Sequence, residues 1–156
     1  MATIGFDKHD HQSCIRSAVD RVTAHCDAAG LSLTPVRRRV LEILLERHSA
    51  MGAYEVLDVL RTEGKGSQPP VAYRALDFLV THGFAHRIER LNAFVACVNP
   101  NEGHVPSFLI CRECNRVAES EADAAVLGQA AHDADFVIEA AVLEAEGVCR
   151  ACRDKA

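Results

Sequence analysis

The 156-residue sequence contains no tryptophan, and aromatic residues make up only 5% of it, although aliphatic side chains are plentiful. This composition favours compact helical packing over a β-sandwich. There is no run of about 18 apolar residues, so we expect no segment to span a membrane. The first residues, MATIGFDKHDHQ, have neither an apolar core nor a small-residue cleavage site, so we expect no signal peptide. A chain of this length is expected to fold as one domain or two small ones.

A disulfide-dense scaffold is also excluded, because seven cysteines are spread over a long chain and their odd number leaves one without a pair. We therefore expect a cytoplasmic protein with reduced thiols. Cys14 and Cys26 would lie about 18 Å apart on one helix, which is too far for a disulfide. We assign no role to these two cysteines or to His9 and His11.

Charge is divided unevenly along the chain, whose net charge is −5. Residues 1–98 contain 12 Lys and Arg against 11 Asp and Glu, a net charge of +1. Residues 99–156 contain 5 against 11, a net charge of −6. The average therefore conceals a near-neutral half that is compatible with nucleic acid and an acidic half. We infer two parts with different functions.

The first half follows the pattern of a winged helix-turn-helix. Apolar residues recur at helical spacing from Ile15 to Cys26, and a second helix is predicted after Thr34, an N-cap residue, and Pro35 in the first helical position. Two further helices are predicted over residues 53–63 and 69–82. After Gly83 the pattern changes to two short β-favouring segments, residues 85–90 and 93–98, which predict a hairpin.

The second half predicts a small α/β domain that holds two cysteine knuckles. Residues 99–106, with their Pro, Asn and Gly, predict a hinge. Beyond them we predict strands over residues 107–111, 116–119 and 136–145 and a helix over residues 121–134. The fold class is therefore α+β, with a winged-helix domain at 1–98 followed by the α/β domain at 107–156.

The two knuckles predict a structural zinc site. Cys111 and Cys114 form one Cys-x-x-Cys pair, Cys149 and Cys152 form another, and four thiolates make a closed tetrahedral site. The alternative is a redox-active pair, as in thioredoxin-like folds. No sequence resembling the thioredoxin βαβ unit surrounds either pair, which favours zinc.

A second ligand set is only suggested by residue type. His86 and Cys97 lie on the predicted hairpin, His104 in the hinge and Glu119 on a predicted strand. Taken singly, these are a surface histidine, a buried cysteine, a loop histidine and a solvated carboxylate. Their spacing alone does not join them into one site.

Six segments spread over roughly residues 15–152 form a specific pattern: LTPVRRRVLEIL, AYEVLDVLR, PPVAYRALDFLVTHGFAHRIE, FVAC, FLICRECNRVAE and GVCRAC. In these segments the chain resembles the ferric uptake regulator family, most closely its zinc uptake regulator branch. The resemblance implies a homodimeric, metal-dependent repressor that binds operator DNA with inverted-repeat half-sites, has an N-terminal winged helix and a C-terminal dimerisation domain, and controls zinc uptake genes.

The resemblance also implies two zinc ions per subunit. Cys111, Cys114, Cys149 and Cys152 match the structural site, and His86, Cys97, His104 and Glu119 match the regulatory site of the zinc branch. The chain lacks the His- and Asp-rich run of iron-type members and has Ala140 where the family has a further histidine ligand. We therefore expect no third metal site.

The ligand types also favour zinc over iron. Two imidazoles, one thiolate and one carboxylate suit tetrahedral Zn²⁺, whereas Fe²⁺ or Mn²⁺ would more naturally use histidine and carboxylate alone. An iron- or peroxide-responsive regulator of the same family is the alternative. Four protein ligands leave no open position for a catalytic water, so we expect a sensor and not an enzyme.

The DNA contacts are predicted on the helix after Pro69 and Pro70. Tyr73 and Arg74 occupy its first turns, where Arg74 can donate two hydrogen bonds to guanine and Tyr73 can contact a thymine methyl group or a phosphate. An isolated Tyr-Arg pair would be interpreted as a core tyrosine and a solvated arginine. Its place after Pro69 and Pro70 in the predicted winged helix instead favours contact with DNA. Family members usually carry Thr or Ser where this chain has Val71.

Phosphate contacts are predicted on the two preceding helices. Tyr54 begins the third helix, and Arg37, Arg38 and Arg39 are expected mostly to face outward from the second. Such contacts position a protein on DNA without specifying sequence. The alternative for the three arginines is a solvated helix face.

Overall fold

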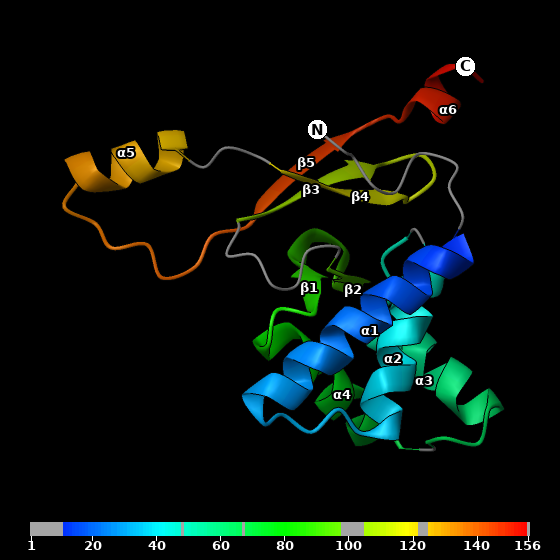
Figure 1. The fold of residues 1–156 in the computed structure, drawn as a ribbon. Helices are drawn as coiled ribbons and strands as arrows, with labels where there is room; N and C mark the ends of the chain where they lie inside the picture. Colours follow the sequence, from blue (N-terminus) through cyan, green and yellow to red (C-terminus); the bar gives the residue numbers. More distant parts are fainter. Residues whose placement is uncertain (1–10, 48, 67, 98–104, 122–124, 156) are drawn as a thin grey trace. The chain divides into compact units, whose positions relative to one another are not determined.

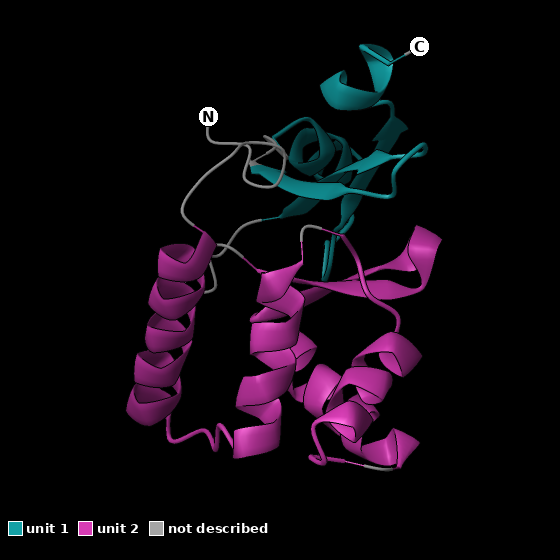
Figure 2. Cartoon of the chain, turned by 90° about the vertical axis from the view of Figure 1, so that its right-hand side faces the viewer, with its two compact units in different colours: residues 1–6, 103–156 teal, residues 7–102 magenta. Residues whose placement is uncertain are grey.

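The computed structural model describes residues 11–47, 49–66, 68–97, 105–121 and 125–155. These residues separate into two compact units, one within residues 7–102 and the other within residues 103–156 (Figure 2). Each unit has its own helices and strands. No helix among the described residues combines the length and apolar character needed to cross a membrane.

The larger unit contains the predicted helices and hairpin (Figure 1). Within its described residues the order of elements is α1 (His11–Ala29), α2 (Pro35–Glu46), α3 (Ala53–Thr62), α4 (Pro69–Thr81), β1 (Ala85–Ile88), a 3-10 turn (Glu89–Leu91) and β2 (Ala93–Ala96). Helices followed by a two-stranded antiparallel wing confirm the predicted winged helix-turn-helix.

Local sequence signals set the ends of these helices. The Thr34 hydroxyl accepts a hydrogen bond from the Arg37 N–H at 3.4 Å, and Pro35 occupies the first position of α2. At α3 the N–H of Gly52 donates to the Glu55 carboxylate at 2.8 Å. Gly83 follows α4 with φ of +76°, a conformation that glycine adopts without steric cost.

The core of the larger unit lies between the four helices and the wing. α3 packs on α4, and both pack on α2. The side chains that fill this core are mainly aliphatic, and the largest fully buried ones include Leu41, Ile43, Met51, Leu57, Leu60, Leu76, Leu79, Phe84 and Ile88. Burial of apolar area at about 25 cal/mol per Å² is the main stabilising contribution to such a unit.

The wing is a short hairpin whose turn depends on one residue. β1 and β2 pair from Ala85 opposite Ala96 to Ile88 opposite Ala93. Asn92, with φ of +46°, closes the turn, and its side-chain oxygen accepts a 2.8 Å hydrogen bond from Arg87. Asparagine tolerates this left-handed conformation better than most residues.

The smaller unit is a three-stranded sheet with two helices. Its described elements are β3 (Pro106–Cys111), β4 (Val117–Glu121), α5 (Ala125–Asp133), β5 (Leu143–Gly147) and the short α6 (Arg150–Arg153). The strand order is β4-β3-β5, with β3 antiparallel to β4 and parallel to β5. The parallel pair requires a long crossover, which includes α5.

The predicted strand over residues 136–145 is wrong for most of its length. The strand begins only at Leu143, and Phe136 and Val137 have 66% and 81% of their surface exposed. The register explains this difference, because Leu143 lies opposite Ser107, the second residue of β3. Earlier residues run past the end of β3 and have no neighbouring strand among the residues that the structure describes, despite their β-favouring side chains.

Candidate functional site

The sheet of the smaller unit brings the two cysteine knuckles together. Cys111 ends β3, Cys114 lies in the turn before β4, and Cys149 and Cys152 flank the start of α6. Because β3 pairs with β5 in parallel, Cys111 lies opposite Gly147, two residues before Cys149. Residues separated by almost forty positions in sequence therefore meet at one end of the sheet.

The first knuckle is a tight turn with a left-handed residue. The N–H of Asn115 donates to the Cys111 carbonyl at 2.8 Å, and the N–H of Cys111 donates to the Arg116 carbonyl at 2.9 Å. Asn115 has φ of +56°, which reverses the chain directly after Cys114. This turn keeps the two sulfurs of the knuckle on one side.

The four thiols are arranged as a zinc site requires. Their Sγ atoms all lie within 4.8 Å of one another, and the sulfurs of Cys114 and Cys149 are 3.8 Å apart. A tetrahedron with zinc–sulfur bonds of about 2.3 Å has edges of about 3.8 Å. All seven cysteines of the chain are described, and none forms a disulfide.

The electrostatics of the cluster also suit a cation. The N–H of Cys149 donates to the Cys111 sulfur at 3.4 Å, and this hydrogen bond is the main reason that the pKa of Cys111 is lowered to about 6. The hydrogen bond with Cys149, followed by burial, raises the pKa of Cys152 to about 12. Several thiolates cannot share this small space unless a positive charge compensates them.

The second predicted ligand set is distributed over both units. His86 lies on β1 and Cys97 directly after β2, and a ring nitrogen of His86 lies within 4.8 Å of the buried Cys97 sulfur. The Cys97 N–H donates to the Phe84 carbonyl at 2.9 Å, which holds this residue beside the wing. Glu119 is buried on β4 of the smaller unit. His104 lies outside the described residues.

The predicted DNA-reading residues are exposed on the larger unit. Tyr73 and Arg74 are exposed in the first half of α4, and Tyr54 is exposed at the start of α3. The rings of Tyr54 and Tyr73 meet edge to face with centroids 6.4 Å apart. Beside them is a hollow of about 430 Å³, which also reaches Arg87 and Asn92 of the wing.

The three consecutive arginines of α2 have three different environments. The Arg37 guanidinium lies 4.0 Å from the centre of the Phe78 ring and donates to the Ser32 carbonyl at 2.6 Å. The Arg38 side chain is 48% exposed, with one ion pair to Glu42 at 3.3 Å. The Arg39 side chain is only 18% exposed. The prediction that these residues mostly face outward is therefore wrong for Arg39.

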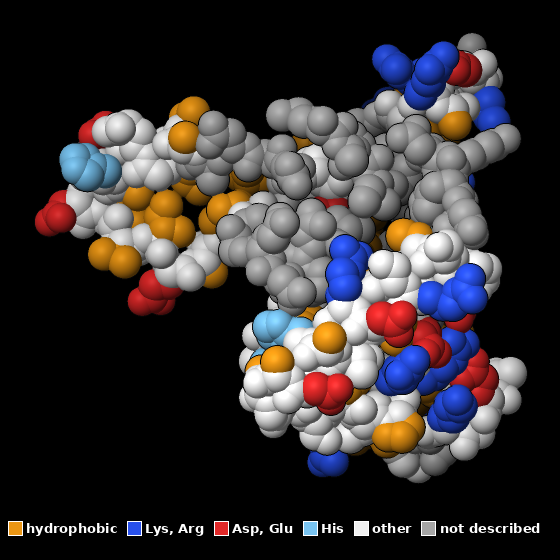
Figure 3. All heavy atoms as spheres, viewed as in Figure 1, with side chains coloured by type: hydrophobic (Ala, Val, Ile, Leu, Met, Phe, Trp, Pro, Cys, Tyr) orange, Lys and Arg blue, Asp and Glu red, His pale blue; other side chains and the backbone are white. Residues whose placement is uncertain are grey.

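Arg39 instead contacts three carboxylates, those of Glu42, Glu46 and Glu63. Glu42 follows it by three residues on α2, a spacing that could have been recognised in the sequence. Glu63 is 24 residues away, and no local pattern indicates that pair. On the face shown in Figure 3, basic and acidic side chains are interspersed over this helical unit.

Comparison with known proteins finds relatives over most of the chain. The sequence profile of the ferric uptake regulator family matches residues 28–145. Zinc uptake regulation proteins of Escherichia coli (strain K12) and Shigella flexneri are each 35% identical over 130 residues, or 81% of this chain and 76% of theirs. A solved zinc uptake regulator complexed with zinc and DNA is 32% identical, with a TM-score of 0.85 over 90% of this chain and 96% of that one. The extent of these matches, together with the winged helix, shows that the chain belongs to the ferric uptake regulator family.

Proposed function

We propose that this chain is a zinc-responsive transcriptional repressor that binds operator DNA as a homodimer when zinc is bound and controls zinc uptake genes. One observation carries the proposal: a winged helix exposing Tyr73 and Arg74 is joined in one chain to four thiols at tetrahedral spacing. The first feature suits DNA recognition and the second suits zinc. We place the protein in the cytoplasm, where its thiols stay reduced.

The recognition helix is α4, and its exposed residues read the operator. Arg74 donates two hydrogen bonds to a guanine edge in the major groove, and Tyr73 contacts a thymine methyl group or a phosphate. Tyr54 at the start of α3 and Arg38 on α2 contact phosphates, which fix the position of the unit on the duplex. The Arg37 guanidinium is held against the Phe78 ring. It can therefore contact a phosphate only through those N–H groups that do not donate to the Ser32 carbonyl.

Two zinc ions per subunit are proposed, with different tasks. The thiolates of Cys111, Cys114, Cys149 and Cys152 hold the structural ion and connect the two knuckles. His86, Cys97, His104 and Glu119 are the proposed ligands of the regulatory ion, in accordance with the family pattern. Bound zinc supplies positive charge and fixed tetrahedral geometry to each set. Neither set leaves an open position for substrate, which supports a regulator and not an enzyme.

The division of the second set suggests how sensing works. His86 and Cys97 belong to the winged-helix unit, whereas Glu119 belongs to the sheet of the other unit. Ligation by residues of both units would restrict their relative orientation. In a dimer this restriction favours the separation of recognition helices that fits half-sites about one helical turn apart. Linkage then requires operator DNA to raise the zinc affinity by the same factor.

The homodimer is proposed to form through the smaller unit. Its described residues expose several large apolar side chains, namely Leu109, Val126, Leu127, Phe136, Val137, Ile138 and Val142. A concentration of exposed apolar side chains in one small unit is typical of a protein interface. Burial in a dimer would also explain why residues 136–142, which precede β5, carry exposed apolar side chains.

The alternative sensor within this family responds to iron or peroxide. Cys97 argues against it, because a buried thiolate beside an imidazole is a softer ligand set than Fe²⁺ prefers. A third possibility is a zinc-ribbon module that binds other proteins and not DNA. It is disfavoured because the exposed residues of α4 would then have no function.

The test is zinc content per subunit together with operator affinity, measured for wild type and Cys97→Ser. The variant is expected to remain a folded dimer with its four-thiolate zinc but to lose zinc-dependent operator binding followed by fluorescence anisotropy. Cys14→Ser, at a half-buried thiol of α1, is the matched control. Wild-type zinc dependence in Cys97→Ser would show that Cys97 is only a core residue.

A further inference from the structure

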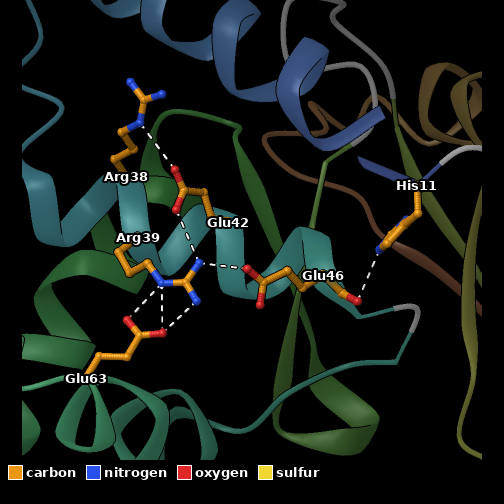
Figure 4. A network of polar contacts seen from close by, with 6 residues as sticks. All are labelled: His11, Arg38, Arg39, Glu42, Glu46 and Glu63. Atoms are coloured by element: carbon orange, nitrogen blue, oxygen red, sulfur yellow. Dashed lines mark hydrogen bonds and ion pairs between the residues drawn. The ribbon is translucent and has the colours of Figure 1, made fainter. Parts of the chain in front are cut away.

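The side chain of Arg39 joins α2 to the end of α3 through an unusually complete set of ion pairs (Figure 4). Its Nε donates to both oxygens of Glu63 at 2.8 and 3.1 Å, and its Nη2 donates to one of them at 2.6 Å. Its Nη1 donates to Glu46 at 2.7 Å and to Glu42 at 3.2 Å. Every nitrogen of the guanidinium group therefore donates to a carboxylate. The fork of Arg39 matches the two oxygens of Glu63, a geometry that lysine cannot reproduce.

The Arg39–Glu63 pair is partly shielded from solvent. The side chains of Arg39 and Glu63 are 18% and 27% exposed, so water screens their attraction less than that of a surface pair. The hydrogen bond to Glu63 is the largest contribution that raises the pKa of Arg39 above its usual range. The same hydrogen bond lowers the pKa of Glu63.

Glu63 lies at the end of α3, where the chain turns toward α4. It directly follows α3 and precedes Gly64, whose φ is +69°. The N–H of Lys65 donates to the Leu60 carbonyl at 2.9 Å, so the chain turns sharply here toward α4. A Cβ atom on Gly66 would lie 3.1 Å from the side chain of Val71, which shows how closely this turn packs on the start of α4. Glu63 thus begins the turn of the helix-turn-helix.

We propose that Arg39 is a positioning residue for operator recognition, which holds the turn between α3 and α4 through Glu63 and thereby sets the orientation of α4. The inference rests on the proposed DNA binding by this chain. The proposal gives Arg39 a different role from its exposed neighbour Arg38, although the two arginines are adjacent in the sequence. Arg38 remains the phosphate contact, and Arg39 acts through another residue and not on the DNA.

The charge around Arg39 supports this division of roles. The network of Arg38, Arg39, Glu42, Glu46 and Glu63 contains two positive groups and three negative ones. A phosphate approaching Arg39 would have to displace a carboxylate from it and would meet the remaining carboxylates. Positioning needs no such displacement, because the ion pairs form within the folded unit.

The experiment compares Arg39→Gln, Arg39→Lys and Glu63→Gln with Arg38→Gln as the matched control. Affinities for operator and for random DNA are measured at several salt concentrations with zinc bound. Arg39→Gln and Glu63→Gln should each lose about tenfold or more in operator affinity, with little loss on random DNA and an unchanged salt slope. Arg38→Gln should weaken binding to both DNAs and reduce the slope by about one, as expected for one lost phosphate contact.

Glu63→Gln gives the sharpest contrast, because it removes a negative charge. Simple electrostatics predicts tighter DNA binding by this variant, whereas loss of positioning predicts weaker operator binding. Arg39→Lys keeps the positive charge but loses the fork, so it should resemble Arg39→Gln and not wild type. A double variant of Arg39→Gln and Glu63→Gln should lose little more operator affinity than Arg39→Gln alone, because Arg39→Gln already removes the pair with Glu63.

The outcomes are distinguishable. Circular dichroism and thermal unfolding report whether each variant is folded, and Arg39→Lys and Glu63→Gln keep the test decisive if Arg39→Gln fails to fold. Lower thermal stability with unchanged operator affinity would overturn the inference, as would a reduced salt slope in Arg39→Gln or tighter binding by Glu63→Gln. Wild type without zinc-dependent operator binding would instead overturn the proposed function itself.

Discussion

Tyr54 and Tyr73 form an edge-to-face pair, with ring centroids 6.4 Å apart, although 61% and 48% of their surfaces are exposed. The pair connects the start of α3 to the first half of α4. Aromatic pairs of this geometry contribute about 0.5–1.5 kcal/mol beyond the burial of their area. Tyr54 can therefore orient Tyr73 in addition to making the phosphate contact that we propose for it.

Two substitutions of Tyr54 separate these contributions. Tyr54→Phe keeps the ring pair and removes only the hydroxyl, whereas Tyr54→Ala removes both. We expect Tyr54→Ala to lose about 1 kcal/mol more operator binding than Tyr54→Phe, because Tyr73 is no longer held. Anisotropy titrations with zinc present measure both values. Equal losses would assign the whole effect to the hydroxyl group.

Arg74→Ala should affect specificity more than general affinity. Loss of a bidentate contact to guanine should cost about 1–3 kcal/mol and relax the preference at one base position in each half-site. Binding to a panel of operators that differ at single positions measures this effect. The same loss on operator and random DNA would place Arg74 on the phosphate backbone.

Cys111→Ser should remove the structural zinc. Because a structural metal contributes its binding free energy directly to folding, the smaller unit should unfold or the dimer should dissociate. The larger unit, with its own core, should keep its helices. Zinc analysis, analytical ultracentrifugation and circular dichroism test this expectation, with Cys14→Ser as the control. A stable zinc-free dimer of Cys111→Ser would contradict the assignment.

The ion pair of Glu63 predicts a pH dependence of stability. The hydrogen bond from Arg39 lowers the pKa of Glu63 in the folded state. Its stabilisation is therefore complete above the unfolded-state pKa of about 4.3 and is lost as the pH falls through the lower folded-state value. The difference in unfolding free energy between wild type and Glu63→Gln should be largest near neutral pH and disappear in acid.

Urea unfolding at a series of pH values measures that difference. Glu89→Gln is the control, because the Glu89 side chain is 71% exposed and its ion pair with Arg87 is long, at 3.6 Å. A pH-independent difference for Glu63→Gln would show that the carboxylate does not stabilise the fold through its charge.

The elements of the larger unit could be predicted because their signals are local. The Thr34 cap, Pro35 and Gly83 mark helix ends within a few residues of themselves. The strand predicted over residues 136–145 failed for the opposite reason. Its β-favouring side chains cannot indicate where a neighbouring strand ends, and the sheet begins only where Leu143 meets Ser107.

The sequence by itself determined the ligand chemistry, because two Cys-x-x-Cys pairs offer four thiolates wherever they are placed. Only the tertiary structure decided that the pairs meet, through the parallel register that sets Cys111 opposite Gly147. It also decided the role of Arg39, which the sequence grouped with its neighbours and which the fold directs at Glu63. The physical reason is the same in both cases: hydrogen bonding within a turn is encoded locally, whereas contacts between distant segments depend on how whole elements pack.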